Sequence, residues 1–236
     1  MKVQQLPSVN GWRAISILLV LGYHTSMMHG VPLNLSRLFS ALFDGNLGVR
    51  FFFTISGFLI TWLMLKEEAE FGCVSLKNFY IRRILRIWPV YFSYVALLGV
   101  LQAFGLLVQD PFVWRGLLTF TRNFFDIMLE TYADGVSGHC WSLSIEEQFY
   151  FFWPFIFLLL KTKGRIWFLI ATILFSNGFG TIDNLGLHDR HAHILFGKCS
   201  TFYYMDCLSW GCLGAIWLTA VDGGGANWKN GLRNIL

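Results

Sequence analysis

Long apolar stretches alternate with short polar connections along the chain, and six of these stretches are long enough to cross a lipid bilayer. A transmembrane helix needs about 20 consecutive, predominantly apolar residues. The pattern therefore predicts an all-α integral membrane protein, folded as a polytopic bundle of about six transmembrane helices. The predicted spans are residues 12–29, 47–65, 87–108, 141–160, 166–182 and 202–221.

The fifth stretch is the weakest of the six, because Asn177 and two glycines interrupt it. Residues 1–221 are expected to form one transmembrane domain, and the glycine-rich residues 222–236 are expected to form a cytoplasmic tail. Because no terminal structure follows the six spans, we expect this domain to be incomplete at its C-terminal end.

Lysine and arginine residues predict how the helices are oriented. Twelve of the eighteen fall near the N-terminus, in or beside the connections after the second and fourth spans, or in the C-terminal tail. Cytoplasmic connections carry the excess of positive charge in membrane proteins. The sequence therefore predicts a multi-pass protein of the inner (plasma) membrane whose N-terminus is cytoplasmic.

Composition supports the membrane assignment. Hydrophobic residues make up 55% of the 236 residues and charged residues only 14%, whereas soluble domains carry about a quarter charged residues. The net charge of +4 follows the predicted topology, so we expect membrane lipids and no nucleic acid as partners. The five cysteines show no metal-ligand spacing and are interpreted as small core residues.

The first predicted span carries two ionisable residues, Arg13 and His24, with ten residues between them. At a rise of about 1.5 Å per residue, they lie roughly 16 Å apart along the helix axis. The predicted orientation places Arg13 at the cytoplasmic boundary and His24 in the extracytoplasmic half. Such a group inside a membrane indicates a function, because a partner, a cavity or a substrate has to offset its desolvation.

Ser56 and Gly57 interrupt a run of bulky residues in the second span. Small residues allow another helix to approach closely, and such a packing notch is one interpretation. The other is that the notch leaves room for an acyl chain or a pantetheine arm beside the first helix.

Arg82, Arg83 and Arg86 form a basic cluster on the predicted cytoplasmic side, ahead of the third span. Such a cluster can be a topology anchor that reaches the phospholipid headgroups. Guanidinium groups also bind phosphate oxygens in bidentate fashion. A cofactor with several phosphates, such as coenzyme A, would therefore suit the same residues.

Two adjacent glutamates, Glu146 and Glu147, lie near the start of the fourth span. They stand about 100° apart around a helix, so they cannot share one environment. Ser144 and Glu147 have the spacing of a capping box, which predicts a structural role at the helix start for Glu147. Glu146 is expected in the same leaflet as His24, where a carboxylate can fix the tautomer of an imidazole and stabilise the imidazolium. The alternative is a glutamate that is hydrogen-bonded at a helix start and unrelated to His24.

Two further features have no decided role. Asp206 lies in the outer half of the sixth span, where it either lines the same cavity as His24 and Glu146 or pairs with a basic loop residue. Three outer histidines have spacings that would suit a metal, but without further acidic or cysteine ligands they are expected to be solvated. They are His188, His191 and His193. We therefore expect no metal site.

Four motifs, taken in order, resemble those of a known family. They are the pair Arg13 and His24, LGVRFFFTISGFLIT from residue 47, RRILRIWPVYF from residue 82 and WSLSIEEQFYFFWP from residue 141. In this order they resemble the membrane-bound acyltransferase family three, which includes sugar O-acetyltransferases. The chain has Asn10 and Trp12 where members commonly have Asp and Leu, and it offers six spans where members usually have about ten.

This resemblance implies an integral membrane O-acyltransferase that moves an acyl group, usually acetyl, to a hydroxyl of a carbohydrate, a lipid-linked sugar or a related cell-surface acceptor. The co-substrate would be acetyl-coenzyme A or another acyl-coenzyme A on the cytoplasmic side, with no permanently bound cofactor. The implied site consists of an essential pair, a basic motif and a glutamate, which are Arg13 and His24, Arg82, Arg83 and Arg86, and Glu146.

On this interpretation His24, oriented by Glu146, is the general base for the acceptor hydroxyl. Arg13 holds the charged part of the donor or a structural carboxylate. A covalent acyl-imidazole intermediate is an open alternative to direct transfer. Two other functions also fit charged residues inside a membrane, namely a glycolipid transporter or flippase and a catalytically inactive, truncated scaffold. The sequence lacks the paired short, broken helices of a transporter, which weighs against the first of these.

Overall fold

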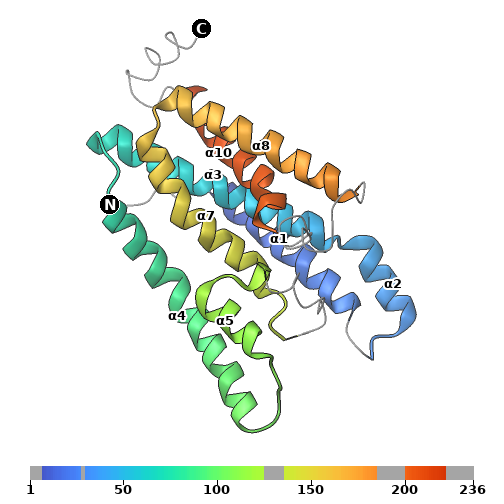
Figure 1. The fold of residues 1–236 in the computed structure, drawn as a ribbon. Helices are drawn as coiled ribbons and strands as arrows, with labels where there is room; N and C mark the ends of the chain where they lie inside the picture. Colours follow the sequence, from blue (N-terminus) through green and yellow to red (C-terminus); the bar gives the residue numbers. More distant parts are fainter. Residues whose placement is uncertain (1–6, 28–29, 125–135, 185–199, 222–236) are drawn as a thin grey trace. The chain divides into compact units, whose positions relative to one another are not determined.

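The structure, a computed structural model, describes residues 7–27, 30–124, 136–184 and 200–221. Within these ranges the regular elements are α-helices (Figure 1). They are α1 (Pro7–Ser26), α2 (Leu33–Leu42), α3 (Gly45–Phe71), α4 (Leu76–Ala103), α5 (Pro111–Thr119), α7 (Cys140–Leu159), α8 (Thr162–Asn184) and α10 (Thr201–Val221).

The chain divides into two compact units. The first comprises Met1–Leu65, Leu169–Leu174 and Tyr204–Leu236, and the second comprises Lys66–Phe168 and Phe175–Tyr203. The helices α1 and α2, with most of α3 and α10, therefore belong to the first unit. The helices α4, α5 and α7 belong to the second unit, and α8 contributes to both.

Three helical segments are long and apolar enough to cross a membrane, which confirms the helical class and the membrane character. They are Leu33–Phe71, Leu76–Ala103 and Thr201–Val221. The first, fourth and fifth predicted spans also fold as helices, in α1, α7 and α8. Polar residues lower the hydropathy of α1, and two tryptophans, one tyrosine and two glutamates lower that of α7. A total of about six spans therefore stays a prediction.

The third predicted span differs most from the observed helix. The helix α4 begins at Leu76, well before residue 87, because the Ser75 side chain accepts a hydrogen bond of 3.4 Å from the Asn78 amide and caps the helix there. It ends at Ala103 instead of residue 108, and Gly105 follows with a φ of 71°, which favours glycine. The basic cluster therefore lies inside α4.

In the first unit, the backbones of α3 and α10 lie very close to each other. A Cβ added to Gly57 would lie 2.1 Å from the Leu208 carbonyl oxygen, and one added to Gly211 would lie 1.9 Å from the Thr54 carbonyl oxygen. Only glycine leaves enough room for such an approach. The packing interpretation of Ser56 and Gly57 is therefore correct, and α10 occupies the notch.

In the second unit, α4 and α7 run antiparallel and are joined at three levels. The Tyr80 hydroxyl donates to the Phe151 carbonyl at 2.8 Å, and the Trp88 Nε1 donates to the Glu147 Oε2 at 3.2 Å. Close to the start of α7, the Tyr94 hydroxyl donates to the Val136 carbonyl. These contacts fix which residues of the two helices face each other.

The helix α5 completes the core of this unit. Its apolar centre contains residues from α4, α5 and the start of α7, which are Tyr91, Val95, Leu98, Val113, Leu117 and Cys140. The Tyr91 hydroxyl donates to the Leu117 carbonyl at 2.8 Å, so this buried phenol has a partner.

Candidate functional site

The predicted site residues of the first span both lie on α1. Eleven residues correspond to about three full turns, so Arg13 and His24 project from nearly the same side of α1. The guanidinium carbon of Arg13 lies 5.4 Å from the centre of the Phe52 ring in α3. The His24 side chain is exposed, and its ring lies 5.9 Å from the Tyr23 ring.

The structure assigns a partner to Asp206, and this partner lies in the helix α3 and not in a loop. The Arg50 Nη1 lies 3.8 Å from the Asp206 Oδ2, and the exposed fractions of the two side chains are 33% and 15%. The same Arg50 lies over the Tyr204 ring at 5.5 Å and contacts the Cys207 sulfur at 3.7 Å. Asp206 is therefore a paired carboxylate within the first unit.

Glu146 lies in the second unit, where its side chain is almost completely buried, with the whole residue 3% exposed. It accepts a hydrogen bond from the hydroxyl of Tyr150, one turn further along α7. The guanidinium carbon of Arg83 in α4 lies 5.0 Å from the centre of the Tyr150 ring. A buried carboxylate and a guanidinium from different helices therefore meet at one tyrosine.

Sequence reasoning did not select Tyr150, although a signal for it was present. Residues four apart lie on the same face of a helix, and Tyr150 follows Glu146 at this spacing. The antiparallel packing of α4 and α7 brings Glu146 and Arg83 to the same tyrosine. The placement of Glu146 in the outer half of the membrane and of Arg83 at the cytoplasmic side stays a prediction.

The capping role predicted for Glu147 is wrong. The helix α7 begins at Cys140, and the Ser144 hydroxyl donates to the Cys140 carbonyl at 3.0 Å inside the helix. Ser144 is therefore not at the helix start and cannot form a capping box with Glu147. Glu147 still has a structural partner, because its Oε2 accepts the Trp88 indole hydrogen bond.

The three arginines of the basic cluster have different surroundings. Arg82 is exposed, and its Nη2 lies 2.9 Å from the Glu67 Oε2. Arg83 lies over the Tyr150 ring, and also 5.8 Å from the centre of the Phe79 ring. Arg86 lines a cavity of about 460 Å³ beside α4 and α7. Phosphate binding by these residues stays a prediction.

The predicted site is thus distributed over both units. Arg13 and His24 belong to the first unit, whereas Glu146 and the basic cluster belong to the second. The contact expected between His24 and Glu146 stays a prediction. The three outer histidines lie outside the described residues. Within the described ranges, no group of three or more His, Cys, Asp or Glu side chains is arranged to hold a metal ion.

Comparison with known proteins gives a consistent set of relatives. The family described as Acyltransferase domain matches residues 6–224. A Staphylococcus aureus (strain COL) protein named "Putative O-acetyltransferase" is 35% identical over 218 residues, covering 83% of this chain and 32% of that protein. The peptidoglycan O-acetyltransferase OatA of Listeria monocytogenes is 29% identical over 170 residues, covering 66% of this chain and 25% of that protein.

A third relative is an uncharacterised protein of Haemophilus influenzae, 35% identical over 136 residues, which are 52% of this chain and 55% of that protein. The chain spans about a third of the length of the Staphylococcus aureus relatives. No solved structure matches the chain.

Proposed function

Because the chain belongs to the Acyltransferase domain family, which matches it over residues 6–224, we propose that it acts as an integral membrane O-acyltransferase. It moves an acetyl group from acetyl-coenzyme A on the cytoplasmic side to a hydroxyl of a cell-surface carbohydrate or a lipid-linked sugar. In this proposal the protein has about six spans in the plasma membrane, with its N-terminus in the cytoplasm.

The observation that carries the proposal is the arrangement around Tyr150. Glu146 is buried, yet it has a hydrogen-bond partner, and Arg83 lies against the same tyrosine from another helix. An ionisable side chain is costly to bury inside a membrane and is by default a candidate for a functional site, which supports a role for Glu146. The relatives named as O-acetyltransferases favour acyl transfer over the transport of a glycolipid or an inactive scaffold.

The donor binds through its phosphates in this proposal. Guanidinium groups bind phosphate oxygens through paired, charge-assisted hydrogen bonds. Arg83 and Arg86 are the main candidates, because Arg83 adjoins Glu146 through Tyr150 and Arg86 lines the cavity. Arg82 is the third candidate, and its ion pair with Glu67 offsets its charge. In the same proposal Arg13 holds a charged part of the donor or a structural carboxylate.

Transfer itself requires a base. In the proposed step His24 takes the proton of the acceptor hydroxyl while the hydroxyl oxygen forms a bond to the acetyl carbonyl carbon. The carbon–sulfur bond of the thioester then breaks, and the departing thiolate takes the proton from the imidazolium. Glu146 orients the imidazole and stabilises its charge. An acetyl-imidazole intermediate on His24 is a second route to the same products.

The test is an acetyl-transfer assay with labelled acetyl-coenzyme A on membranes that contain the protein. His24→Ala should lower the rate by about 100-fold or more, the usual contribution of a general base, without affecting membrane insertion. Thr25→Ala is the matched control, because the Thr25 hydroxyl donates to the Leu21 carbonyl at 2.8 Å within α1. Full activity of His24→Ala would contradict the base role. A wild-type protein without transfer activity would contradict the proposed function.

A further inference from the structure

Two rows of side chains with the same spacing run along α4 and α7 in the second unit. In each row the intervals are four, three and four residues, so the members of a row lie on one face of their helix. We call the two rows together the seam. The row on α4 is Arg83, Ile87, Val90 and Tyr94, and the row on α7 is His139, Leu143, Glu146 and Tyr150.

Contacts at both ends show that the two rows face each other. At one end the rings of Tyr94 and His139 lie 5.4 Å apart. At the other end the guanidinium carbon of Arg83 lies 5.0 Å from the centre of the Tyr150 ring. Because α4 and α7 run antiparallel and the intervals match, the residues in between follow one another in the same order. The seam is about 16 Å long and leads from Tyr94 and His139 to Glu146.

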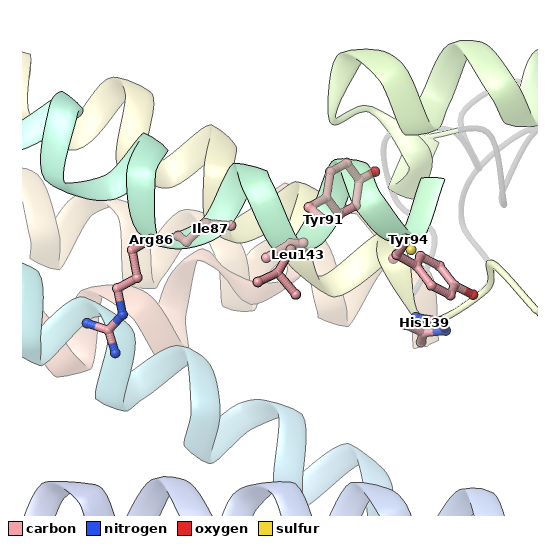
Figure 2. A pocket seen from close by; sticks show the side chains of 8 residues that line it. Arg86, Ile87, Tyr91, Tyr94, His139 and Leu143 are labelled. Carbon is pink, nitrogen blue, oxygen red and sulfur yellow. The ribbon is translucent and has the colours of Figure 1, made fainter. Parts of the chain in front are cut away.

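The cavity of about 460 Å³ follows the seam. Figure 2 shows Tyr94 and His139 beside each other at one end of the labelled side chains, and Arg86 at the other. Glu146 does not line the cavity and lies one turn beyond Leu143, the last lining residue on α7. Small-molecule sites in proteins usually measure about 300–1,000 Å³. The cavity is therefore large enough for a ligand and leads toward Glu146.

The end formed by Tyr94 and His139 is complementary to a sugar. His139 is exposed and Tyr94 is partly buried, and the hydrogen bond from the Tyr94 hydroxyl to the Val136 carbonyl fixes the phenol ring. An imidazole both donates and accepts hydrogen bonds, so it can bind the hydroxyl groups of a sugar. The phenol ring offers an apolar face to the C–H groups of the same sugar. The predicted orientation places this end on the extracytoplasmic side.

The middle of the cavity is apolar. Its walls include Ile87, Val90 and Leu143. A phosphate group would lose its hydration at these walls without gaining a hydrogen bond, whereas a sugar can place its C–H face against them. A hydrocarbon chain would also fit the walls, but it makes no hydrogen bond to the imidazole at the end. The cavity is thus more complementary to a sugar than to a lipid tail or to the phosphates of the donor.

We propose that this cavity binds the carbohydrate acceptor, with sugar units at Tyr94 and His139 and the reacting hydroxyl directed along the seam toward Glu146. The inference rests on the acyl-transfer function proposed above. It agrees with the proposed transfer step, in which Glu146 orients His24 to take the proton of that hydroxyl. Donor and acceptor then reach the site from opposite ends of the seam, the donor from Arg83 and the acceptor from Tyr94.

The experiment blocks the cavity and measures acceptor and donor separately. In cells whose own copy is replaced by a variant, ester-linked acetate on the surface polysaccharide is released with mild alkali and measured by mass spectrometry. Membranes of the same cells are tested for binding of labelled acetyl-coenzyme A. Val90→Trp adds an indole at an exposed position in the cavity wall. It should remove the ester acetate, because a substrate displaced by about 1 Å can react about 100-fold more slowly, and it should leave acetyl-coenzyme A binding nearly unchanged.

Val100→Trp is the matched control, because Val100 is also exposed on α4 but does not line the cavity. Its ester acetate should stay at the wild-type level. His139→Ala removes the imidazole without filling the cavity, so it should lower the ester acetate and leave donor binding unchanged. Ser142→Ala is the control for this variant, since the Ser142 hydroxyl donates to the His139 carbonyl at 3.1 Å and does not line the cavity.

Four results would overturn the inference. Ester acetate at the wild-type level in Val90→Trp would mean that only bilayer lipid fills the cavity. A parallel loss of acetyl-coenzyme A binding would show that the donor occupies it. Ester acetate in the lipid extract instead of the polysaccharide would exclude a carbohydrate acceptor. In these three cases acetylation by the wild type leaves the acyl-transfer function standing, whereas wild-type cells without ester acetate would refute that function and this inference with it.

Discussion

Arg83 in α4 lies over the ring of Tyr150 in α7, with 5.0 Å between the guanidinium carbon and the ring centre. The hydroxyl of the same tyrosine donates to the buried Glu146. Tyr150 therefore makes two contacts that substitutions can separate. The ring contributes a cation–π contact, and the hydroxyl contributes a hydrogen bond to a carboxylate.

Two variants of Tyr150 should affect different kinetic constants. Tyr150→Phe keeps the ring under Arg83, so it should lower kcat for acetyl transfer and leave the KM for acetyl-coenzyme A nearly unchanged. Tyr150→Ala should also raise this KM by about 2- to 5-fold, because a cation–π contact contributes about 0.5–1 kcal/mol. Steady-state kinetics with varied acetyl-coenzyme A measures both effects.

Tyr80→Phe is the control for these variants. The Tyr80 hydroxyl also crosses from α4 to α7, where it donates to the Phe151 carbonyl at 2.8 Å. If Tyr80→Phe and Tyr150→Phe change kcat to the same extent, the effect of Tyr150 is only the loss of packing between the helices.

Arg165 should be important for the stability of the second unit. It donates two hydrogen bonds of 2.7 Å to the Glu68 carboxylate and a third of 2.8 Å to the Phe157 carbonyl, and its side chain is 5% exposed. Arg165→Lys retains the charge but cannot reproduce the planar fork. We expect it to lower the free energy of unfolding by about 1.5–3 kcal/mol. Thermal unfolding in detergent micelles would show the loss.

Lys163→Gln provides the comparison for Arg165→Lys. Lys163 is exposed and lies two residues away on the same helix, so its replacement should change stability by less than about 0.5 kcal/mol. If the Arg165→Lys protein unfolds at the wild-type temperature, the paired hydrogen bonds from Arg165 to Glu68 contribute nothing to stability.

Two glycines of α10 should respond differently to alanine. A Cβ at Gly211 would lie 1.9 Å from the Thr54 carbonyl oxygen, whereas one at Gly214 would meet the Phe58 side chain at an ordinary 3.7 Å. Gly211→Ala should therefore lower the free energy of unfolding by about 1–3 kcal/mol. Gly214→Ala should leave it nearly unchanged. Thermal unfolding of the two variants measures this difference. Equal stability of both variants would contradict the close crossing of α3 and α10.

The pair of Arg50 and Asp206 should be detectable as an energetic coupling. A partly exposed pair at 3.8 Å is expected to contribute about 1 kcal/mol or less. In a double-mutant cycle, Arg50→Gln with Asp206→Asn should therefore destabilise less than the sum of the single changes. Arg37→Gln, an exposed arginine on α2, should be additive with Asp206→Asn. Strict additivity in both cycles would show that Arg50 and Asp206 do not interact.

Hydropathy alone predicted the bounds of a helix correctly where the whole helix is apolar. The sixth span was predicted at residues 202–221, and α10 runs from Thr201 to Val221. Helix ends marked by local chemistry were predicted less well. The helix α4 starts at a serine cap that lies outside its apolar stretch, and the spacing of Ser144 and Glu147 occurs inside a helix that had already begun.

The candidate site could be predicted from the sequence only where its contacts lie within one helix. Contacts within one helix follow from its period, so the pairing of Glu146 with Tyr150 could have been found from their spacing. Contacts between helices need a register that the sequence does not contain. The approach of Arg83 to Tyr150 and the pairing of Arg50 with Asp206 both depend on how two helices are packed. The expected contact of His24 with Glu146 stays a prediction.

The contact of Gly57 and Gly211 with the backbones opposite them has a mechanical consequence. Packed helices can slide past each other when the side chains between them change rotamer. At this crossing, backbone atoms take the place that side chains normally occupy between two helices. We therefore expect α3 and α10 to resist sliding past each other at this crossing.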